Sequence, residues 1–309
     1  MAPDFDLVIV GGGPAGLTAG LYAARARMKT VLLEKGAVGG QVLLTDWIEN
    51  YPGFPDGLTG FDLMEKMAAH AGRFGLETRT ATVASMDLAK DVKTLFLQGE
   101  GSITTRAVIL VTGAGPNKLG VPGEAAFTGK GVSYCATCDG PFYRDQEIAV
   151  IGGGNTAVQE ANYLTRFASK VTLIHRRDQL RATKIVQEKA FANPKIAFRW
   201  NSVVTAIEGD SGVRRVLLQD TVTGLKDTLD LQGVFVLIGV SANNQCIPLD
   251  VVGADKDGFV LTDSEMRTRI PGVYAAGDIR SKEVRQVINA AGEAAVASWM
   301  AEQYLSGYE

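Results

Sequence analysis

The stretch Phe5-Asp-Leu-Val-Ile-Val-Gly-Gly-Gly-Pro-Ala-Gly16 decides the fold of the first part of the chain. Residues 5–10 are mostly apolar and predict a buried strand. The Ala- and Leu-rich residues after the glycines predict a helix that extends to about Arg27, and residues 30–34 predict a second strand. The stretch therefore begins a β-α-β unit with the pattern Gly-x-Gly-x-x-Gly at its first turn.

The spacing of these glycines predicts a dinucleotide site. Gly11 permits the tight turn, Gly13 permits close approach of a pyrophosphate, and Gly16 permits close packing of helix and strand. The N–H groups at the start of the helix then hold the phosphates. Glu34 ends the second strand, where a carboxylate can accept both hydroxyls of an adenosine ribose. Glycines that only turn the chain are the alternative, but the strand, the helix and the acid at this distance favour nucleotide binding.

The same pattern occurs a second time with one informative difference. Residues 147–151 predict a strand, Gly152-Gly-Gly-Asn-Thr-Ala157 opens a helix, and residues 171–174 predict the next strand. His175 lies as many positions after Gly152 as Glu34 lies after Gly11. A base therefore stands where the first unit has its acid.

Three arginines follow this histidine, at Arg176, Arg177 and Arg181. Guanidinium groups pair with phosphate oxygens, whereas a carboxylate at this place would repel a 2′-phosphate. The first site should therefore take FAD or NAD, and the second should take NADP(H). The alternative is a solvated basic helix start, and the shared register favours phosphate binding. We expect His175 to line or pack against the phosphate site.

The remaining segments complete two nested modules. Residues 36–60 predict a long ligand-covering loop, residues 58–74 an amphipathic helix with a surface histidine, His70, and residues 76–111 a run of strands. An apolar strand runs into Gly277-Asp278, and a last helix is expected over residues 286–305. Because Thr112 to Asn117 is similar to Ile238 to Asn243, the second module is expected as an insertion in the first. The expected domains are residues 1–115 with 245–309, and residues 116–244.

Cys135-Ala-Thr-Cys138-Asp139 lies just upstream of the second glycine pattern. This Cys-x-x-Cys spacing predicts either a redox-active dithiol or part of a metal site. A zinc site needs four ligands, and only Cys246 remains, without clustered histidines, so no metal is expected. The dithiol interpretation is favoured, with a short turn leading into a helix whose N–H groups lower a thiol pKa.

The composition sets limits on the class of protein. The chain has 309 residues, 46 % hydrophobic, with a net charge of −3, which predicts two domains and no broad basic surface for nucleic acid. No apolar run approaches the roughly 20 residues that cross a bilayer, and the N-terminus has no basic segment of a secretory signal. Three cysteines are too few for a disulfide scaffold. We therefore expect a cytoplasmic protein without a membrane or nucleic-acid partner.

The order of these motifs over nearly the whole chain resembles the low-molecular-weight, bacterial-type thioredoxin reductases. The Cys-Ala-Thr-Cys-Asp-Gly segment and the basic cluster are the most discriminating parts. The resemblance implies an α/β fold with two Rossmann-like three-layer domains, the NADPH domain inserted into the FAD domain, and a homodimer. It implies a thioredoxin-disulfide reductase that uses FAD and NADPH. Two alternatives remain. The disulfide substrate could be a peroxiredoxin-linked or glutaredoxin-like protein, or the chain could be a non-catalytic NADPH-sensing flavoprotein.

The resemblance also implies roles for individual residues. Cys138 would face the flavin, Cys135 would attack the partner disulfide, and Asp139 would handle protons. The positions that would bind FAD are Gly11, Gly13, Pro14, Ala15, Gly16, Glu34, Gly40, Gln41, Asn50, Thr112, Gly113, Gly277, Asp278, Arg285, Gln286 and Val287. The positions that would bind NADPH are Gly152, Gly154, Asn155, Thr156, His175, Arg176, Arg177, Arg181, Ile238 and Gly239.

Two further expectations concern the inserted module. The disulfide and the nicotinamide site lie on the same module and must both reach one flavin, so we expect this module to turn about the crossings near residues 115 and 245. Pro141 stands directly after the Asp-Gly of the redox motif, where the family often has an aromatic residue, and Phe142 follows it. This difference bears on how a partner protein would dock.

Overall fold

The computed structural model describes residues 2–45 and 47–307. The chain forms two compact units, residues 1–115 with 241–309 and residues 116–240. We call them unit 1 and unit 2 and describe each by itself. The chain crosses between them at β7 (Ala114–Pro116) and β16 (Val240–Ala242), which pair as a two-stranded sheet.

Unit 1 is built on a seven-stranded sheet. Along the sheet the strands are β3 (Glu77–Thr80), β2 (Thr30–Glu34), β1 (Phe5–Val10), β6 (Gly101–Leu110), β5 (Lys93–Leu97) and β4 (Val83–Asp87), with β17 (Val273–Ala275) on the second half of β6. β3, β2, β1, β6 and β17 are parallel, and β4 and β5 extend the sheet in antiparallel fashion. The long strand β6 therefore has β5 along its first half and β17 along its second.

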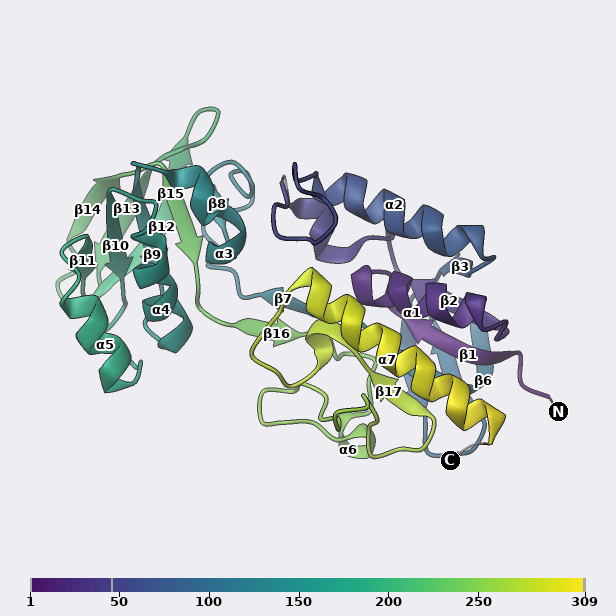
Figure 1. Cartoon of the computed structure of the whole chain (residues 1–309). Coiled ribbons are helices and arrows are strands. Elements are labelled where there is room, and N and C mark those ends of the chain that lie inside the picture. Colours follow the sequence, from purple (N-terminus) through teal and green to yellow (C-terminus); the bar gives the residue numbers. More distant parts are fainter. Residues whose placement is uncertain (1, 46, 308–309) are drawn as a thin grey trace. The chain divides into compact units, whose positions relative to one another are not determined.

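Alternating residues of the parallel strands enter two cores. Leu7, Ile9 and Leu32 pack with the helices on one face, and Val8 and Val31 pack on the other face. Each fully buried aliphatic side chain contributes about 1.5–3 kcal/mol. The first face is covered by α1 (Pro14–Arg25) and α7 (Val287–Ser306), which lie side by side, and α2 (Gly60–Arg73) packs on α1 (Figure 1). The other face is closed partly by residues around α6 (Leu249–Val252).

Small residues allow this close packing. A Cβ at Gly16 would lie 1.9 Å from the carbonyl oxygen of Gly11, and Gly20 lies against Leu76. The buried face of α7 consists largely of alanines. The expected loop over residues 36–60 is only partly irregular, because the 3₁₀ helix η1 (Gly40–Leu44) lies within it.

Unit 2 repeats the same plan. Its five-stranded parallel sheet has the order β11 (Ile196–Arg199), β10 (Lys170–Ile174), β9 (Glu147–Ile151), β15 (Gly233–Val236) and β8 (Val132–Ser133). α3 (Ala136–Asp139) and the 3₁₀ helix η2 (Gly140–Tyr143) follow β8, α4 (Asn155–Leu164) follows β9, and α5 (Lys184–Phe191) precedes β11. A three-stranded antiparallel sheet of β12 (Ser202–Gly209), β13 (Val213–Asp220) and β14 (Lys226–Asp230) forms the third layer.

The predicted fold class is confirmed. The order β3-β2-β1-β6 in unit 1 corresponds to β11-β10-β9-β15 in unit 2, so the same β-α-β unit occurs twice. In both sheets the glycine turn follows the central strand at its carboxyl end, which is where open parallel sheets bind their ligands. In the described part of the chain, no helix is both long and apolar enough to cross a membrane.

Lys93 is an exception among the core residues of unit 1 and generates a prediction. It is 2 % exposed at the start of β5, its Nζ donates to the carbonyl oxygen of Asp91 at 3.2 Å, and it lies over the ring of Tyr304. Burial lowers the pKa of this ammonium group below 10.5, and the Asp91 carboxylate only partly opposes the shift. The unfolded chain therefore binds the proton more tightly, so stability should rise with pH until the pH reaches about 10.5.

We expect Lys93→Met to raise the stability of unit 1 by about 1 kcal/mol at pH 7, because it removes a buried charge and keeps the volume. The calorimetric midpoint should rise by about 2–4 °C. The gain over wild type should shrink between pH 7 and pH 10, where wild-type Lys93 loses its proton. Lys66→Met, at an exposed position of α2, is the control and should change little. A lower midpoint for Lys93→Met at pH 7 would contradict this account.

Candidate active site

The two cysteines of the redox motif form a disulfide in unit 2, with their Cα atoms 5.3 Å apart. The edge strand β8 carries the chain into this turn, and Cys135 is the N-cap of the one-turn helix α3. The backbone N–H of Asp139 donates to the carbonyl oxygen of Cys135 at 3.1 Å and closes the turn. Both cysteines are partly exposed, so the disulfide is accessible to another molecule.

Hydrogen bonds around Cys135 favour negative charge on its sulfur. The backbone N–H of Cys138 donates to Cys135 Sγ at 3.2 Å, and the hydroxyl of Thr137 lies 3.4 Å from the same sulfur. Ser133 Oγ accepts the backbone N–H of Cys135 at 3.1 Å and fixes the cysteine backbone. Donors directed at a sulfur stabilise a thiolate relative to a thiol. The turn is therefore suited to thiol–disulfide exchange through Cys135.

Acidic and phenolic groups surround the same turn. Asp139 is half-buried on α3, directly after Cys138. Burial, with the nearby Asp139 carboxylate, raises the pKa of Tyr143 to about 12, so this phenol keeps its proton at neutral pH. Glu160 on α4 accepts the backbone N–H of Ala136 at 3.2 Å, and burial raises its pKa. Asp139 is the carboxyl group nearest in sequence to the exchanging sulfurs.

The glycine turn of unit 1 has the features of a phosphate site. Glu34 Oε2 accepts the backbone N–H of Gly12 at 2.6 Å, and Oε1 accepts that of Gly36 at 3.0 Å. This anchors the carboxylate at the carboxyl end of β2. No heavy atom lies within 4 Å of the place where a Cβ at Gly13 would stand. The backbone at Gly13 is thus open to close approach.

Residues far apart in the sequence meet around this turn. A Cβ at Gly40 would lie 3.3 Å from the Cα of Gly13, and one at Gly277 would lie 3.1 Å from the Cβ of Ala15. Asn50 Nδ2 donates to Gln286 Oε1 at 3.2 Å, which joins the second half of the long loop to the start of α7. The positions expected to bind FAD gather at the carboxyl ends of the unit 1 strands and in the segments that contact them. They are Gly11, Gly13, Pro14, Ala15, Gly16, Glu34, Gly40, Gln41, Asn50, Thr112, Gly113, Gly277, Asp278, Arg285, Gln286 and Val287.

Three buried polar atoms at this edge lack hydrogen-bond partners among the described residues. They are Thr112 Oγ1, Asp278 Oδ1 and Arg285 Nε. Lys282 Nζ lies 3.5 Å from Asp278 Oδ1, close enough for an ion pair, and burial nevertheless raises the pKa of Asp278. Buried polar groups are nearly always satisfied, so unpartnered ones mark the place of a polar ligand. These residues fit a dinucleotide such as FAD, which carries many donors and acceptors.

The Gly277-Asp278 turn is held by a carboxylate from α7. Glu293 Oε2 accepts the backbone N–H of Gly277 at 2.8 Å and pairs with Lys282 at 3.1 Å, while Glu293 Oε1 pairs with Arg280 at 2.7 Å. Arg280 and Lys282 are largely buried. Two cations therefore balance the buried carboxylates of Glu293 and Asp278 and fix the turn that presents Asp278.

The glycine turn of unit 2 repeats this geometry with histidine in place of glutamate. A Cβ at Gly153 would lie 2.3 Å from His175 Cε1, just as one at Gly12 would lie 2.9 Å from Glu34 Cβ. The predicted register between the two turns is thus confirmed. His175 is buried, and burial and the neighbouring arginines lower its pKa, against a hydrogen bond to the backbone of Gln179. A neutral packing ring fits these facts better than a proton donor.

The arginine segment folds back over the second turn. The backbone N–H of Arg181 donates to the carbonyl oxygen of Gly153 at 2.7 Å, and that of Thr183 donates to Asn155 Oδ1 at 2.7 Å. Arg176, Arg177 and Arg181 are all exposed, and no ion pair with the rest of the described chain occupies their guanidinium groups. His175 Nε2 is buried without a partner in the described residues. Of the remaining expected positions, Gly152 and Gly154 lie in the turn after β9, Thr156 lies in the first turn of α4, and Ile238 and Gly239 lie between β15 and β16.

Sequence reasoning missed Glu160 and Glu293. A signal for both existed in the helix periodicity. Glu160 lies between Ala157 and Ala161 on the buried face of α4, and Glu293 lies next to Ala294 on the buried face of α7. An acid on the apolar face of an amphipathic helix needs a local partner, and here each carboxylate finds a backbone N–H.

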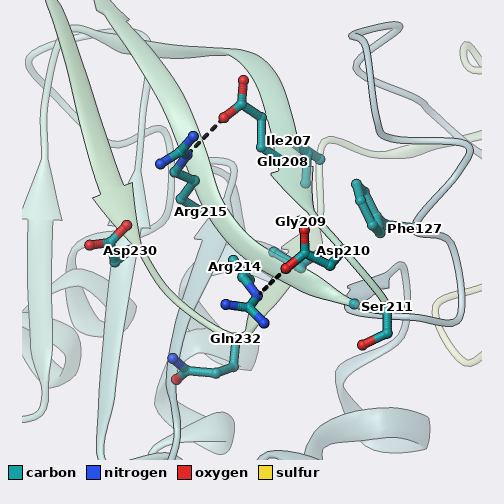
Figure 2. A pocket seen from close by; sticks show the side chains of 12 residues that line it. Phe127, Ile207, Glu208, Gly209, Asp210, Ser211, Arg214, Arg215, Asp230 and Gln232 are labelled. Carbon is teal, nitrogen blue, oxygen red and sulfur yellow. Dashed lines mark hydrogen bonds and ion pairs between the residues drawn. The ribbon is translucent and has the colours of Figure 1, made fainter.

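A hollow of about 1060 Å³ lies elsewhere in unit 2, beside the turn between β12 and β13 (Figure 2). Its arginines are already engaged, Arg214 with Asp210 at 2.9 Å and Arg215 with Glu208 at 2.7 Å. None of the expected site residues lines it. Within the described residues, no group of three or more His, Cys, Asp and Glu side chains could hold a metal ion, and Cys246 stands apart as a free thiol.

Sequence similarity to known proteins extends over nearly the whole chain. A thioredoxin reductase of Peptoclostridium acidaminophilum is 46 % identical over 308 residues, with 97 % of each chain covered. One of Mycolicibacterium smegmatis is 48 % identical over 97 % of this chain and 96 % of its own. The crystal structure of thioredoxin reductase from Streptococcus pyogenes MGAS5005 is 45 % identical, with a TM-score of 0.93 and 98 % of each chain covered.

A protein-family model matches the part of the chain that contains the candidate site. The family model described as "Pyridine nucleotide-disulphide oxidoreductase" matches residues 5–294, which include both glycine turns and the disulfide. The chain belongs to the pyridine nucleotide-disulphide oxidoreductase family.

Proposed function

We propose that this protein is an NADPH-dependent thioredoxin reductase. The observation that carries the proposal is the accessible Cys135–Cys138 disulfide, held in a turn with a sulfur-directed N–H and followed by Asp139. The same unit carries the glycine turn with three arginines that form no ion pair in the described part of the chain, and the other unit carries the turn with Glu34. The full-length similarity to proteins named thioredoxin reductase supports thioredoxin as the disulfide substrate.

The chemistry of the two turns supports one binding place for each cofactor. When bound, NADPH supplies two electrons and FAD relays them to the disulfide. In unit 1 the Gly11–Gly16 turn binds the FAD pyrophosphate, Glu34 binds the ribose, and Asp278 and Thr112 contribute the buried polar atoms. In unit 2 the Gly152 turn binds the NADPH pyrophosphate, and the arginines bind the 2′-phosphate.

The dithiol passes these electrons on by exchange. The Cys135 thiolate attacks one sulfur of the thioredoxin disulfide, and the other thioredoxin sulfur leaves and takes a proton. The Cys138 thiolate then attacks Cys135 Sγ in the mixed disulfide, which restores the Cys135–Cys138 bond and releases the second thioredoxin sulfur, which also takes a proton. Two electrons and two protons therefore reach thioredoxin. The Cys138 N–H directed at Cys135 Sγ favours the attacking thiolate.

We assign proton transfer during this exchange to Asp139. It is half-buried next to Cys138, so its carboxyl can protonate a leaving thiolate and take the proton back. The Tyr143 phenol is poorly suited because its pKa is about 12. His175 is also unsuited, because it packs beneath the second glycine turn. We place this protein in the cytoplasm, where a reducing pool sustains dithiol exchange.

A homodimer through unit 1 is supported by one face of α7. Ile288, Gly292, Val296 and Trp299 recur every three or four residues, so they share a face, and all four are exposed. This stripe carries no charge, and Trp299 is 59 % exposed. Tyr22 on the neighbouring helix α1 is exposed as well. An uncharged apolar stripe with aromatic residues fits a protein interface, and a second copy of the chain is the proposed occupant.

The role of the disulfide is tested by replacing each cysteine in turn. We expect Cys135→Ser and Cys138→Ser each to reduce NADPH oxidation with thioredoxin as acceptor to below about one-thousandth, because neither leaves a dithiol to recycle. Cys246→Ser is the control and should keep wild-type turnover. Retained thioredoxin turnover in either active-site variant would refute the proposed function.

The arginine cluster should decide between the two nicotinamide cofactors. Arg176→Ala combined with Arg181→Ala removes the charge-assisted hydrogen bonds to the 2′-phosphate. The KM for NADPH should rise about tenfold to a hundredfold, while the KM for NADH stays nearly constant. Arg215→Ala, a paired arginine on β13, serves as the control. Equal changes for both cofactors would show that the cluster does not read the 2′-phosphate.

The proposed dimer face predicts the effect of a single charge. Trp299→Glu replaces the largest exposed side chain of the stripe with a carboxylate, so the mass in light scattering should fall from about twice 32.8 kDa to 32.8 kDa. Val222→Glu makes the same kind of change at an exposed position of unit 2 and should leave the mass unaltered. A Trp299→Glu protein that remains dimeric, or a wild-type protein that is monomeric, would rule out this face.

A further inference from the structure

A carboxyl group lies against the backbone of the redox turn. Glu160 belongs to the buried face of α4, beside Ala157 and Ala161, and is itself half-buried. Its Oε2 accepts the backbone N–H of Ala136 at 3.2 Å. This N–H belongs to the peptide group directly after Cys135, so one hydrogen bond separates the carboxyl group from the backbone of the attacking cysteine.

The surroundings of Glu160 supply little compensation for its charge. Burial raises its pKa, and the Ala136 N–H is the group that opposes the shift. On α3 and η2 the titratable groups are Asp139, Tyr143 and the two cysteines, none of them a cation. The charged groups on the other elements around α4 are Glu147 and Lys170, which pair with each other at 3.2 Å, and the exposed Lys184, Glu188 and Lys189 on α5.

We propose that Glu160 is a positioning residue for the dithiol: it holds the peptide after Cys135 and, through its negative charge, sets how readily Cys135 loses its proton. The inference rests on the proposed exchange chemistry of Cys135 and adds a second carboxyl group to it. Asp139 remains the group assigned to proton transfer.

The two hydrogen bonds at the turn act in opposite directions. The Cys138 N–H directed at Cys135 Sγ favours the thiolate. An ionised Glu160, hydrogen-bonded to the peptide after Cys135, opposes it, because like charges in a partly buried site repel each other. The disulfide itself carries no charge, so this repulsion arises only after reduction. Glu160 should therefore raise the thiol pKa and make the disulfide harder to reduce.

A purely structural role predicts something different. The amide of Gln can accept the Ala136 N–H as the carboxylate does, so Glu160→Gln should keep the fold of the turn while it removes the charge. If Glu160 served only as a hydrogen-bond acceptor, the thiol pKa would be unchanged in this variant. The thiol pKa is therefore the quantity that separates the two roles.

The test measures alkylation of Cys135 by iodoacetamide against pH. The full chain, with its flavin, is reduced with dithiothreitol under anaerobic conditions in a Cys246→Ser background, and each cysteine is quantified by mass spectrometry. In Glu160→Gln the apparent pKa of Cys135 should fall by about one unit, which corresponds to about tenfold more thiolate below the pKa. In a glutathione redox buffer at a pH above the Cys135 pKa, where the thiolate prevails, the same variant should favour the reduced form about tenfold, or about 30 mV.

Glu188→Gln on α5 is the matched control, because it removes one exposed carboxylate from the same unit. Its Cys135 profile should coincide with that of wild type. An unchanged or higher pKa in Glu160→Gln, or an equal decrease in Glu188→Gln, would overturn the proposal.

The wild-type protein gives an independent measurement that needs no variant at Glu160. The logarithm of the Cys135 alkylation rate should rise with pH, flatten where the Glu160 carboxyl titrates, and then rise again, because coupled groups titrate in two steps. A single titration step would contradict the proposal. Neither measurement uses thioredoxin or NADPH, so loss of the proposed enzyme activity and loss of this coupling would be recognised separately.

Discussion

One contact constrains both glycine turns. It joins the second glycine of the turn to a residue at the carboxyl end of the next strand, Glu34 in unit 1 and His175 in unit 2. In unit 1 the Gly12 N–H donates to Glu34 at 2.6 Å, and in unit 2 the ring of His175 lies where a Cβ on Gly153 would stand. Neither contact allows a side chain on the glycine. The two turns share the same backbone arrangement. The residue at this single position thus decides whether the turn presents a carboxylate, as in unit 1, or a neutral ring beside arginines, as in unit 2.

This constraint explains why so much was predictable from sequence. Apolar runs, glycine spacing and the distance to Glu34 or His175 are local properties, and they specify the strands, the turns and the shared register of both units. The pairing of Asn50 with Gln286 was not predictable in this way, because it joins a loop to a helix 236 positions away. The same holds for Lys93, whose sequence neighbours give no sign that the fold buries it against Tyr304.

The roles of Glu160 and Glu293 were predictable from the sequence only in part. Their helical periodicity places both on buried faces, but periodicity does not identify the backbone N–H that each carboxylate accepts. The two sites differ in their charge balance. Glu293 is paired with Arg280 and Lys282, so its charge is neutralised within unit 1. Glu160 has the Ala136 N–H alone among the groups that favour its charged form.

That difference matters for function, because an uncompensated charge acts on its neighbours. The paired Glu293 can fix the Asp278 turn without adding net charge at this end of the unit 1 sheet. Glu160 accepts the N–H of the peptide after Cys135, and Cys135 can become anionic only when the disulfide is reduced. A half-buried carboxylate without a cation costs stability in the oxidised state and costs more once a thiolate forms nearby. A turn that holds such a group is therefore biased toward the disulfide, which favours the release of electrons to a partner protein.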